Sequence, residues 1–131
     1  MFVYAQRIIH FLFITSAEKQ NYDVLMIITD GQIHDMNETK QAIIDASKTS
    51  LSIVIVGVGK ESFTNMKELD SDDKLLQYES EHWERDIVQF VPYDDTIAKG
   101  HASLASEVLA EIPDQILQYY EKRGIRPNPP K

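Results

Sequence analysis

The stretch Val24-Leu25-Met26-Ile27-Ile28-Thr29-Asp30-Gly31 decides the fold. Its first five residues form an unbroken apolar run, the pattern of a β-strand that is covered on both faces, as strands of parallel sheets are. The polar sequence Thr-Asp-Gly that follows ends the strand in a turn. The stretch therefore predicts a buried parallel strand over residues 24–28, with Asp30 immediately beyond its carboxyl end.

On either side of this strand, helix and strand patterns alternate along the chain. Two further apolar runs predict strands over residues 51–56 and 87–91. Helices are predicted over residues 2–17, over 36–48, for a turn or two near 63–69, and for a last stretch that ends near residue 124. Parallel strands joined by right-handed crossovers are the natural outcome of such alternation. We expect an α/β fold with three parallel strands, a small sheet for this class and so an incomplete one.

Local signals place the ends of the helices. Asp35, followed three residues later by Glu38, resembles a capping box that opens the second helix, whose inner side would carry Ile43, Ile44 and Ala46. Pro113 must kink or restart the last helix, because proline lacks the amide that would bond back to the preceding turn. The last helix would place on one face Leu104, Val108, Leu109, Ile112, Ile116 and Tyr120. Gly124 is expected to cap its end, and residues 127–131 form a proline-rich tail.

Composition excludes several classes of function. The chain has 131 residues, a formal net charge of −8 and no cysteine. Its length suits a single domain. A strongly acidic chain does not favour nucleic acid or anionic lipid, since both require a positive surface. Without cysteine there are no disulfides, thiolate metal sites or cysteine nucleophiles.

Enzyme motifs fail when their spacing is checked. Gly57-Val58-Gly59-Lys60 follows a strand, as a phosphate-binding loop would. A Walker loop, however, requires glycine where Val54 stands and Ser or Thr where Glu61 stands. The four histidines have no metal-ligand spacing, and no serine lies in a nucleophile-elbow sequence. We expect no nucleotide site here and no enzymatic activity.

Asp30 is the one residue whose position indicates a binding function. An aspartate at the carboxyl end of a buried parallel strand lies where open α/β sheets bind their ligands. A carboxylate there can hold a hard cation such as Mg²⁺ directly or through water. The alternative is that Asp30 only caps the turn that follows the strand.

The order of several segments makes the chain resemble a known family. The segments that carry the resemblance are residues 22–33 (YDVLMIITDGQI), 39–47 (TKQAIIDAS), 51–59 (LSIVIVGVG), 66–70 (MKELD), 84–92 (ERDIVQFVP), 108–113 (VLAEIP) and 124–127 (GIRP). Through them the chain is similar, nearly throughout from residue 22 onward, to the C-terminal half of the von Willebrand factor A-type domain of copines.

This resemblance implies a doubly wound, Rossmann-like three-layer fold and a role in protein binding. Copines carry two C2 domains that give calcium-dependent phospholipid binding, followed by the A-type domain as a protein-interaction module. The resemblance implies a cytoplasmic protein that reaches membranes through those C2 domains, which do not fit within 131 residues.

The resemblance also implies a metal-ion-dependent adhesion site. That site uses an Asp-x-Ser-x-Ser sequence after the first strand, a threonine from a later loop, and the aspartate of Thr-Asp-Gly. Asp30 matches only the last of these. Asp45-Ala46-Ser47-Lys48-Thr49 has a similar spelling but falls on a predicted helix, where Asp45 and Ser47 are about 200° apart. We therefore expect no tightly bound cofactor, and at most weak binding of Mg²⁺ or Mn²⁺ at Asp30.

We expect residues 1–126 to form the C-terminal part of such a domain. In the doubly wound strand order, the strand before Asp30 would lie beside a strand that this part lacks. It would then be an open edge with unpaired backbone groups, which invites pairing with another chain. The expected interface consists of Val24, Leu25, Met26, Ile27 and Ile28. A two-fold homodimer through this edge is the leading hypothesis, and a separate chain that supplies the missing half is the alternative.

The leading functional hypothesis is thus a non-enzymatic module that binds protein partners. A copine-like domain also occurs in plant RING ubiquitin ligases, but a RING requires zinc-binding cysteines and this chain has none. The third hypothesis is a fragment without function.

Overall fold

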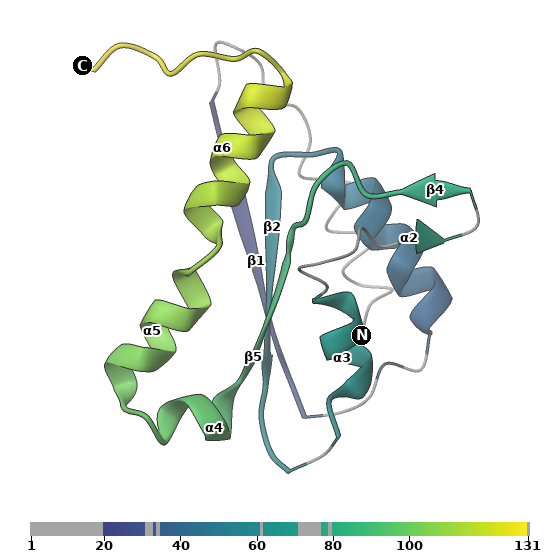
Figure 1. Ribbon diagram of the computed structural model, residues 1–131, viewed down its shortest axis with the longest axis vertical. Coiled ribbons are helices and arrows are strands. Elements are labelled where there is room, and N and C mark those ends of the chain that lie inside the picture. The colour runs from purple at the N-terminus through teal and green to yellow at the C-terminus, as the bar shows by residue number, and fades with distance from the viewer. Residues whose placement is uncertain are drawn as a thin grey trace.

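The computed structural model describes residues 20–30, 33, 35–60, 62–70, 77–78 and 80–130. Three strands form one sheet, in the order β1-β2-β5, and both neighbouring pairs are parallel. Figure 1 shows helices on both faces of this sheet, with α2 and α3 on one face and α4, α5 and α6 on the other. The predicted three-layer α/β fold with three parallel strands is confirmed. The helix predicted over residues 2–17 lies outside the described residues.

The strands follow the apolar runs closely. β1 is Asp23–Thr29, β2 is Leu51–Gly57 and β5 is Val88–Pro92, so the predicted limits are correct to within one residue. The register places Leu25 opposite Ile53 and Ile53 opposite Val88. A second, antiparallel pair, β3 (Gln77–Tyr78) and β4 (Glu81–His82), was not predicted.

The helices agree with the prediction except at two places. α2 is Met36–Ser47, α3 is Thr64–Leu69, α5 is His101–Leu109 and α6 is Ile112–Lys122. α4, Tyr93–Ile97, directly follows β5 and was not predicted. The prediction that Pro113 restarts the last helix is confirmed, since it lies in the first turn of α6. The single face expected for the last helix is wrong at Leu109: the other five residues are half-buried, whereas its side chain is 57% exposed.

The helix caps are only partly as predicted. Asp35 is the N-cap residue of α2, as expected. The prediction of a capping box is wrong, however, because the Asp35 side chain makes no capping hydrogen bond. Gly124 ends α6 as expected from the sequence: it directly follows the C-cap residue Arg123 and has φ at +63°. The amides of Gly124 and Ile125 bond back to the carbonyls of Glu121 and Tyr120 at 3.0 Å each. This pair of bonds is the Schellman motif, which satisfies carbonyls that a helix end leaves free.

The apolar core lies between the sheet and the layer of α2 and α3. All seven residues of β2 are buried. The inner side of α2 is buried as predicted, through Ile43, Ile44 and Ala46. The side chains of Met66 and Leu69 bring α3 onto the same core. Among the described helices, none combines the length and the apolar character that crossing a membrane requires.

A polar network fixes α6 to the other face of the sheet. Arg85, only 3% exposed, donates hydrogen bonds to the carbonyls of Thr49 (2.6 Å) and Leu51 (2.7 Å) and to the Tyr22 hydroxyl (2.9 Å). Tyr22 bonds to Ser52, and the Ser52 hydroxyl donates to the Gln115 side chain of α6. Burial lowers the pKa of Arg85, and the nearby oxygen of Tyr22 partly offsets this effect. The network therefore links the beginning of β1 to α6.

Candidate functional site

The backbone of β1 is bonded on one side within the described part of the chain. The amide of Asp23 donates to the carbonyl of Ser50, and the carbonyl of Thr29 accepts from the amide of Val58, each at 2.8 Å. In a parallel pair, a residue directs its amide and carbonyl to the same side and its neighbours direct theirs to the other. Odd-numbered residues of β1 therefore bond to β2. The amides and carbonyls of Val24, Met26 and Ile28 point away from β2, toward the open side.

The side chains of β1 alternate between two environments. Leu25 and Ile27 pack against the core cluster shared with α2 and α3. Val24, Met26 and Ile28 are 47%, 53% and 64% exposed. The prediction that this strand is covered on both faces is therefore wrong within the described residues, because one face of β1 is open. The same three residues thus present both free backbone groups and uncovered apolar side chains, and we call them the β1 edge.

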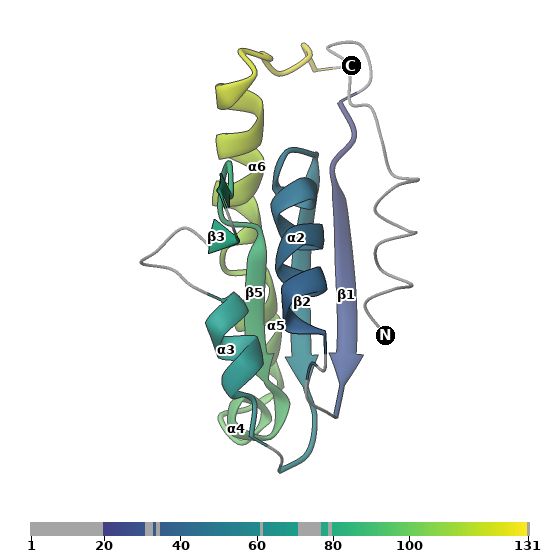
Figure 2. The same ribbon diagram turned by 90° about the vertical axis from the view of Figure 1, so that its right-hand side faces the viewer.

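The open face of β1 follows from where α5 and α6 lie. On that face, Ser52 of β2 bonds to Gln115 of α6, and Gln89 of β5 donates to the carbonyl of Glu107 of α5. These helices thus lie over β2 and β5, and β1 lies at the opposite edge of the sheet from β5 (Figure 2). α6 reaches β1 only where the strand begins, since the Tyr120 hydroxyl donates to the carbonyl of Asn21 at 3.1 Å. The rest of the strand remains uncovered by the C-terminal helices.

Asp30 lies where the sequence places it, directly after β1, and its side chain is exposed. Within the described part of the chain, no group of three or more His, Asp or Glu side chains is arranged to hold a metal ion. A hard divalent cation requires about six oxygen ligands. Asp30 alone does not fit a tight metal centre, and the described residues complete no adhesion site around it.

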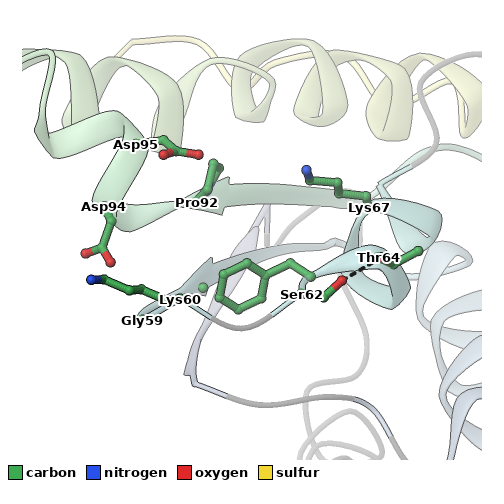
Figure 3. A pocket seen from close by; sticks show the side chains of 10 residues that line it. Gly59, Lys60, Ser62, Thr64, Lys67, Pro92, Asp94 and Asp95 are labelled. Atoms are coloured by element: carbon green, nitrogen blue, oxygen red, sulfur yellow. Dashed lines mark hydrogen bonds between the residues drawn. The ribbon is translucent and has the colours of Figure 1, made fainter.

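A second feature at the same end of the sheet was missed by sequence reasoning. A cavity of about 420 Å³ lies between the end of β2 and the end of β5. Its charged lining residues are Lys60, Lys67, Asp94 and Asp95 (Figure 3). The signal that could have found it is topological, because segments that follow neighbouring parallel strands must emerge at the same edge of the sheet.

Packing and backbone conformation explain why glycine stands at positions 57 and 59, which line this cavity. A Cβ on Gly57 would lie 2.8 Å from the ring of Phe63 and 2.9 Å from that of Phe90. Gly59 has φ at +94°, a conformation that other residues rarely adopt. Close packing and a tight turn after β2 thus account for these two glycines.

The class of protein follows from the fold and the strand ends. A parallel sheet wound on both faces, with an aspartate after the outer strand, corresponds to part of a von Willebrand factor A-type domain. A family model described as Copine matches residues 4–128. The chain belongs to the copine family.

Several relatives agree with this assignment. The chain is 50% identical over 114 residues to Copine-C and 51% identical over 114 residues to Copine-A, both of Dictyostelium discoideum. These matches cover 86% and 87% of this chain. It is 44% identical over 135 residues to Nicotinic receptor-associated protein 1 of Caenorhabditis elegans, which covers 95% of this chain. The matched regions make up 21%, 19% and 20% of those three proteins, so the chain spans about a fifth of the length of these relatives.

Proposed function

We propose that this chain is a non-enzymatic protein-interaction module of a longer copine-type protein. The observation that carries the proposal is the β1 edge, where the described residues leave backbone groups and apolar side chains open side by side. Such an edge favours the addition of a strand from another polypeptide. The name of the Caenorhabditis elegans relative refers to association with a receptor, which is a protein partner.

Membrane contact belongs to other parts of the longer protein in this proposal. There, C2 domains bind phospholipid when calcium is present and bring the module to a membrane from the cytoplasm. The module itself has a net charge of −8, which favours neither an anionic lipid surface nor nucleic acid. Its own contribution is therefore the choice of a protein partner.

The partner that the β1 edge fits without any other component is a second copy of the chain. Two copies related by a two-fold axis perpendicular to the sheet pair their edges antiparallel. Paired residues must share a face, so Met26 lies opposite Met26 of the second copy, and Val24 opposite Ile28. Leu25 then faces Ile27 on the other side of the sheet.

This register also satisfies the backbone. Val24, Met26 and Ile28 are the residues whose amides and carbonyls point outward. With Met26 at the axis, these residues form hydrogen-bonded pairs across the two copies, each exchanging two bonds. The outcome is one six-stranded sheet. A slip of one residue would turn every side chain of one copy to the opposite face of the sheet, so the alternation of side chains along β1 excludes it.

Light scattering coupled to size exclusion tests the dimer. We expect a dimer at micromolar concentration for the wild-type chain and a monomer for Met26→Lys, because the two-fold axis would place the two lysines opposite each other. Leu117→Lys is the matched control, since Leu117 lies on α6 and is 57% exposed, much like Met26 at 53%. A wild-type monomer, or equal dissociation by both variants, would reject the second copy as partner.

A weak divalent-ion site at Asp30 is the remaining part of the proposal. A single carboxylate supplies too few ligands for tight binding. Titration calorimetry with Mg²⁺ and Mn²⁺ is expected to give no micromolar affinity. Asp45→Ala is the control for Asp30→Ala, because both side chains are exposed carboxylates. Micromolar binding that Asp30→Ala alone abolishes would contradict the expectation.

A further inference from the structure

The cavity at the carboxyl ends of β2 and β5 lies where the chain leaves the sheet in two directions. After β2 the chain continues into α3 on one face, and after β5 it continues into α4 and α5 on the other face (Figure 1). Neighbouring parallel strands whose connections diverge in this way leave a crevice beyond their carboxyl ends, and open α/β sheets bind ligands in such crevices. We call this cavity the β2–β5 crevice.

The charges of the β2–β5 crevice lie on separate elements. Lys60 and Lys67 come from the segment after β2 and from α3, whereas Asp94 and Asp95 come from the first turn of α4. All four side chains are exposed, and none forms an ion pair or hydrogen bond with another residue of the described chain. In Figure 3 the side chains of Lys60 and Asp94 extend toward each other at one end of the crevice, while Lys67 lies farther along it. The crevice thus offers both cationic and anionic groups to a ligand.

The apolar part of the crevice is held in place. The rings of Phe63 and Phe90 have centroids 5.3 Å apart, and the missing Cβ of Gly57 makes room for both of them. Nearby, the hydroxyls of Ser62 and Thr64 are joined by a hydrogen bond of 2.8 Å. The apolar wall of the crevice is therefore already in place, and a ligand need not order it on binding.

We propose that the β2–β5 crevice binds a protruding turn of a partner protein that carries an acidic and a basic side chain next to each other. Pockets for small molecules enclose most of the ligand surface. Here every charged lining side chain is exposed, which suits a projection from a second macromolecule better than an enclosed small ligand. The acidic group pairs with one of the two lysines, Lys60 or Lys67, and the basic group with one of the two aspartates, Asp94 or Asp95. This inference rests on the proposed role as a protein-interaction module and assigns it a second contact surface.

Nuclear magnetic resonance titration of the full 131-residue chain tests the proposal. The probe is an acetylated, amidated hexapeptide with adjacent Glu and Lys among glycines, and the matched probe has Gln at both positions. We expect the Glu-Lys probe to shift the amide signals of Gly59, Lys67 and Asp95 saturably at millimolar concentration, and the Gln probe to leave them unchanged. Exposed ion pairs are weak and are screened by salt, so added salt should reverse the shifts.

Two double variants test whether Lys60 and Lys67 contribute to binding of the Glu-Lys probe. Lys60→Gln/Lys67→Gln is expected to weaken the binding of the Glu-Lys probe by about fivefold, the most that one exposed ion pair supplies. Lys48→Gln/Lys122→Gln removes the same charge away from the strand carboxyl ends, since Lys48 precedes β2 and Lys122 ends α6, and it should change nothing. Retained signal dispersion verifies that each variant is folded.

Three results would overturn the proposal. They are the absence of localised shifts, an equal response of the two double variants, and shifts produced by inorganic phosphate but not by the Glu-Lys probe, which would mark a small-anion site. None of these results concerns the β1 edge. Failure here is thus distinguishable from failure of the proposed function, which the light-scattering test decides.

Discussion

β1 and β2 are neighbouring strands of seven residues each, with similar apolar sequences, but they differ in how they are covered. Every residue of β2 is buried, whereas in β1 only Thr29 is, and the residues before it alternate between half-buried and exposed. Polar residues would serve well on an open face of a strand. The apolar side chains of Val24, Met26 and Ile28 therefore indicate that groups outside the described residues cover this face of β1.

The largest predicted effect concerns the residue that links the two strands. Arg85→Ala removes the guanidinium group, which donates hydrogen bonds to the carbonyls of Thr49 and Leu51 and to the Tyr22 hydroxyl. Leaving buried acceptors without a partner costs about 1–3 kcal/mol each, so we expect a total loss of about 4 kcal/mol in the free energy of unfolding. Urea denaturation measures it. Arg85→Lys should restore only part of the lost free energy of unfolding, because one ammonium group cannot reach all the acceptors. Full restoration would contradict this role of the guanidinium group.

A pair of matched substitutions compares the two strands directly. Ile55→Ala in β2 should lower the free energy of unfolding by about 3 kcal/mol, because the side chain is 1% exposed and leaves a cavity. Ile28→Ala in β1 should change it by less than about 0.5 kcal/mol at a dilution where the chain is monomeric, because the side chain is 64% exposed. Equal losses in urea denaturation would mean that the outer face of β1 is already covered.

The smallest predicted effect concerns the one place where α6 reaches β1. Burial raises the pKa of Tyr120 above its ordinary value of 10.0, and the nearby tyrosines add to the increase. The folded state thus holds this proton more tightly than the unfolded state does. The contribution to stability is fully present below pH 10 and is lost as the pH rises through the folded pKa. Thermal unfolding between pH 9 and 11 should show a shallower alkaline loss for Tyr120→Phe than for the wild type, and parallel curves would contradict the assignment.

The sequence predicted the fold well because burial leaves a strong pattern in it. The apolar runs located β1, β2 and β5 to within one residue, and Pro113 and Gly124 marked helix ends through fixed backbone properties. The short elements α4 and β3–β4 were missed, since five and two residues are too few for a periodic signal.

The candidate site was predicted less completely, because it depends on tertiary neighbours. Asp30 lies at the predicted strand end, but which face of β1 is covered depends on where α5 and α6 pack. The buried position of Arg85 goes against the usual exposure of arginine. The β2–β5 crevice brings together residues up to 38 positions apart, Gly57 and Asp95, which no local pattern relates.

Amide hydrogen exchange along β1 tests most directly whether this strand is an open edge strand that pairs with another chain. We expect the amides of Leu25 and Ile27, which bond to β2, to be protected at every protein concentration. Those of Val24, Met26 and Ile28 should exchange freely in dilute solution and become protected as the concentration rises, but not in Met26→Lys. Protection of these three amides in a dilute monomer would contradict the account, because the molecule itself would then already cover its edge.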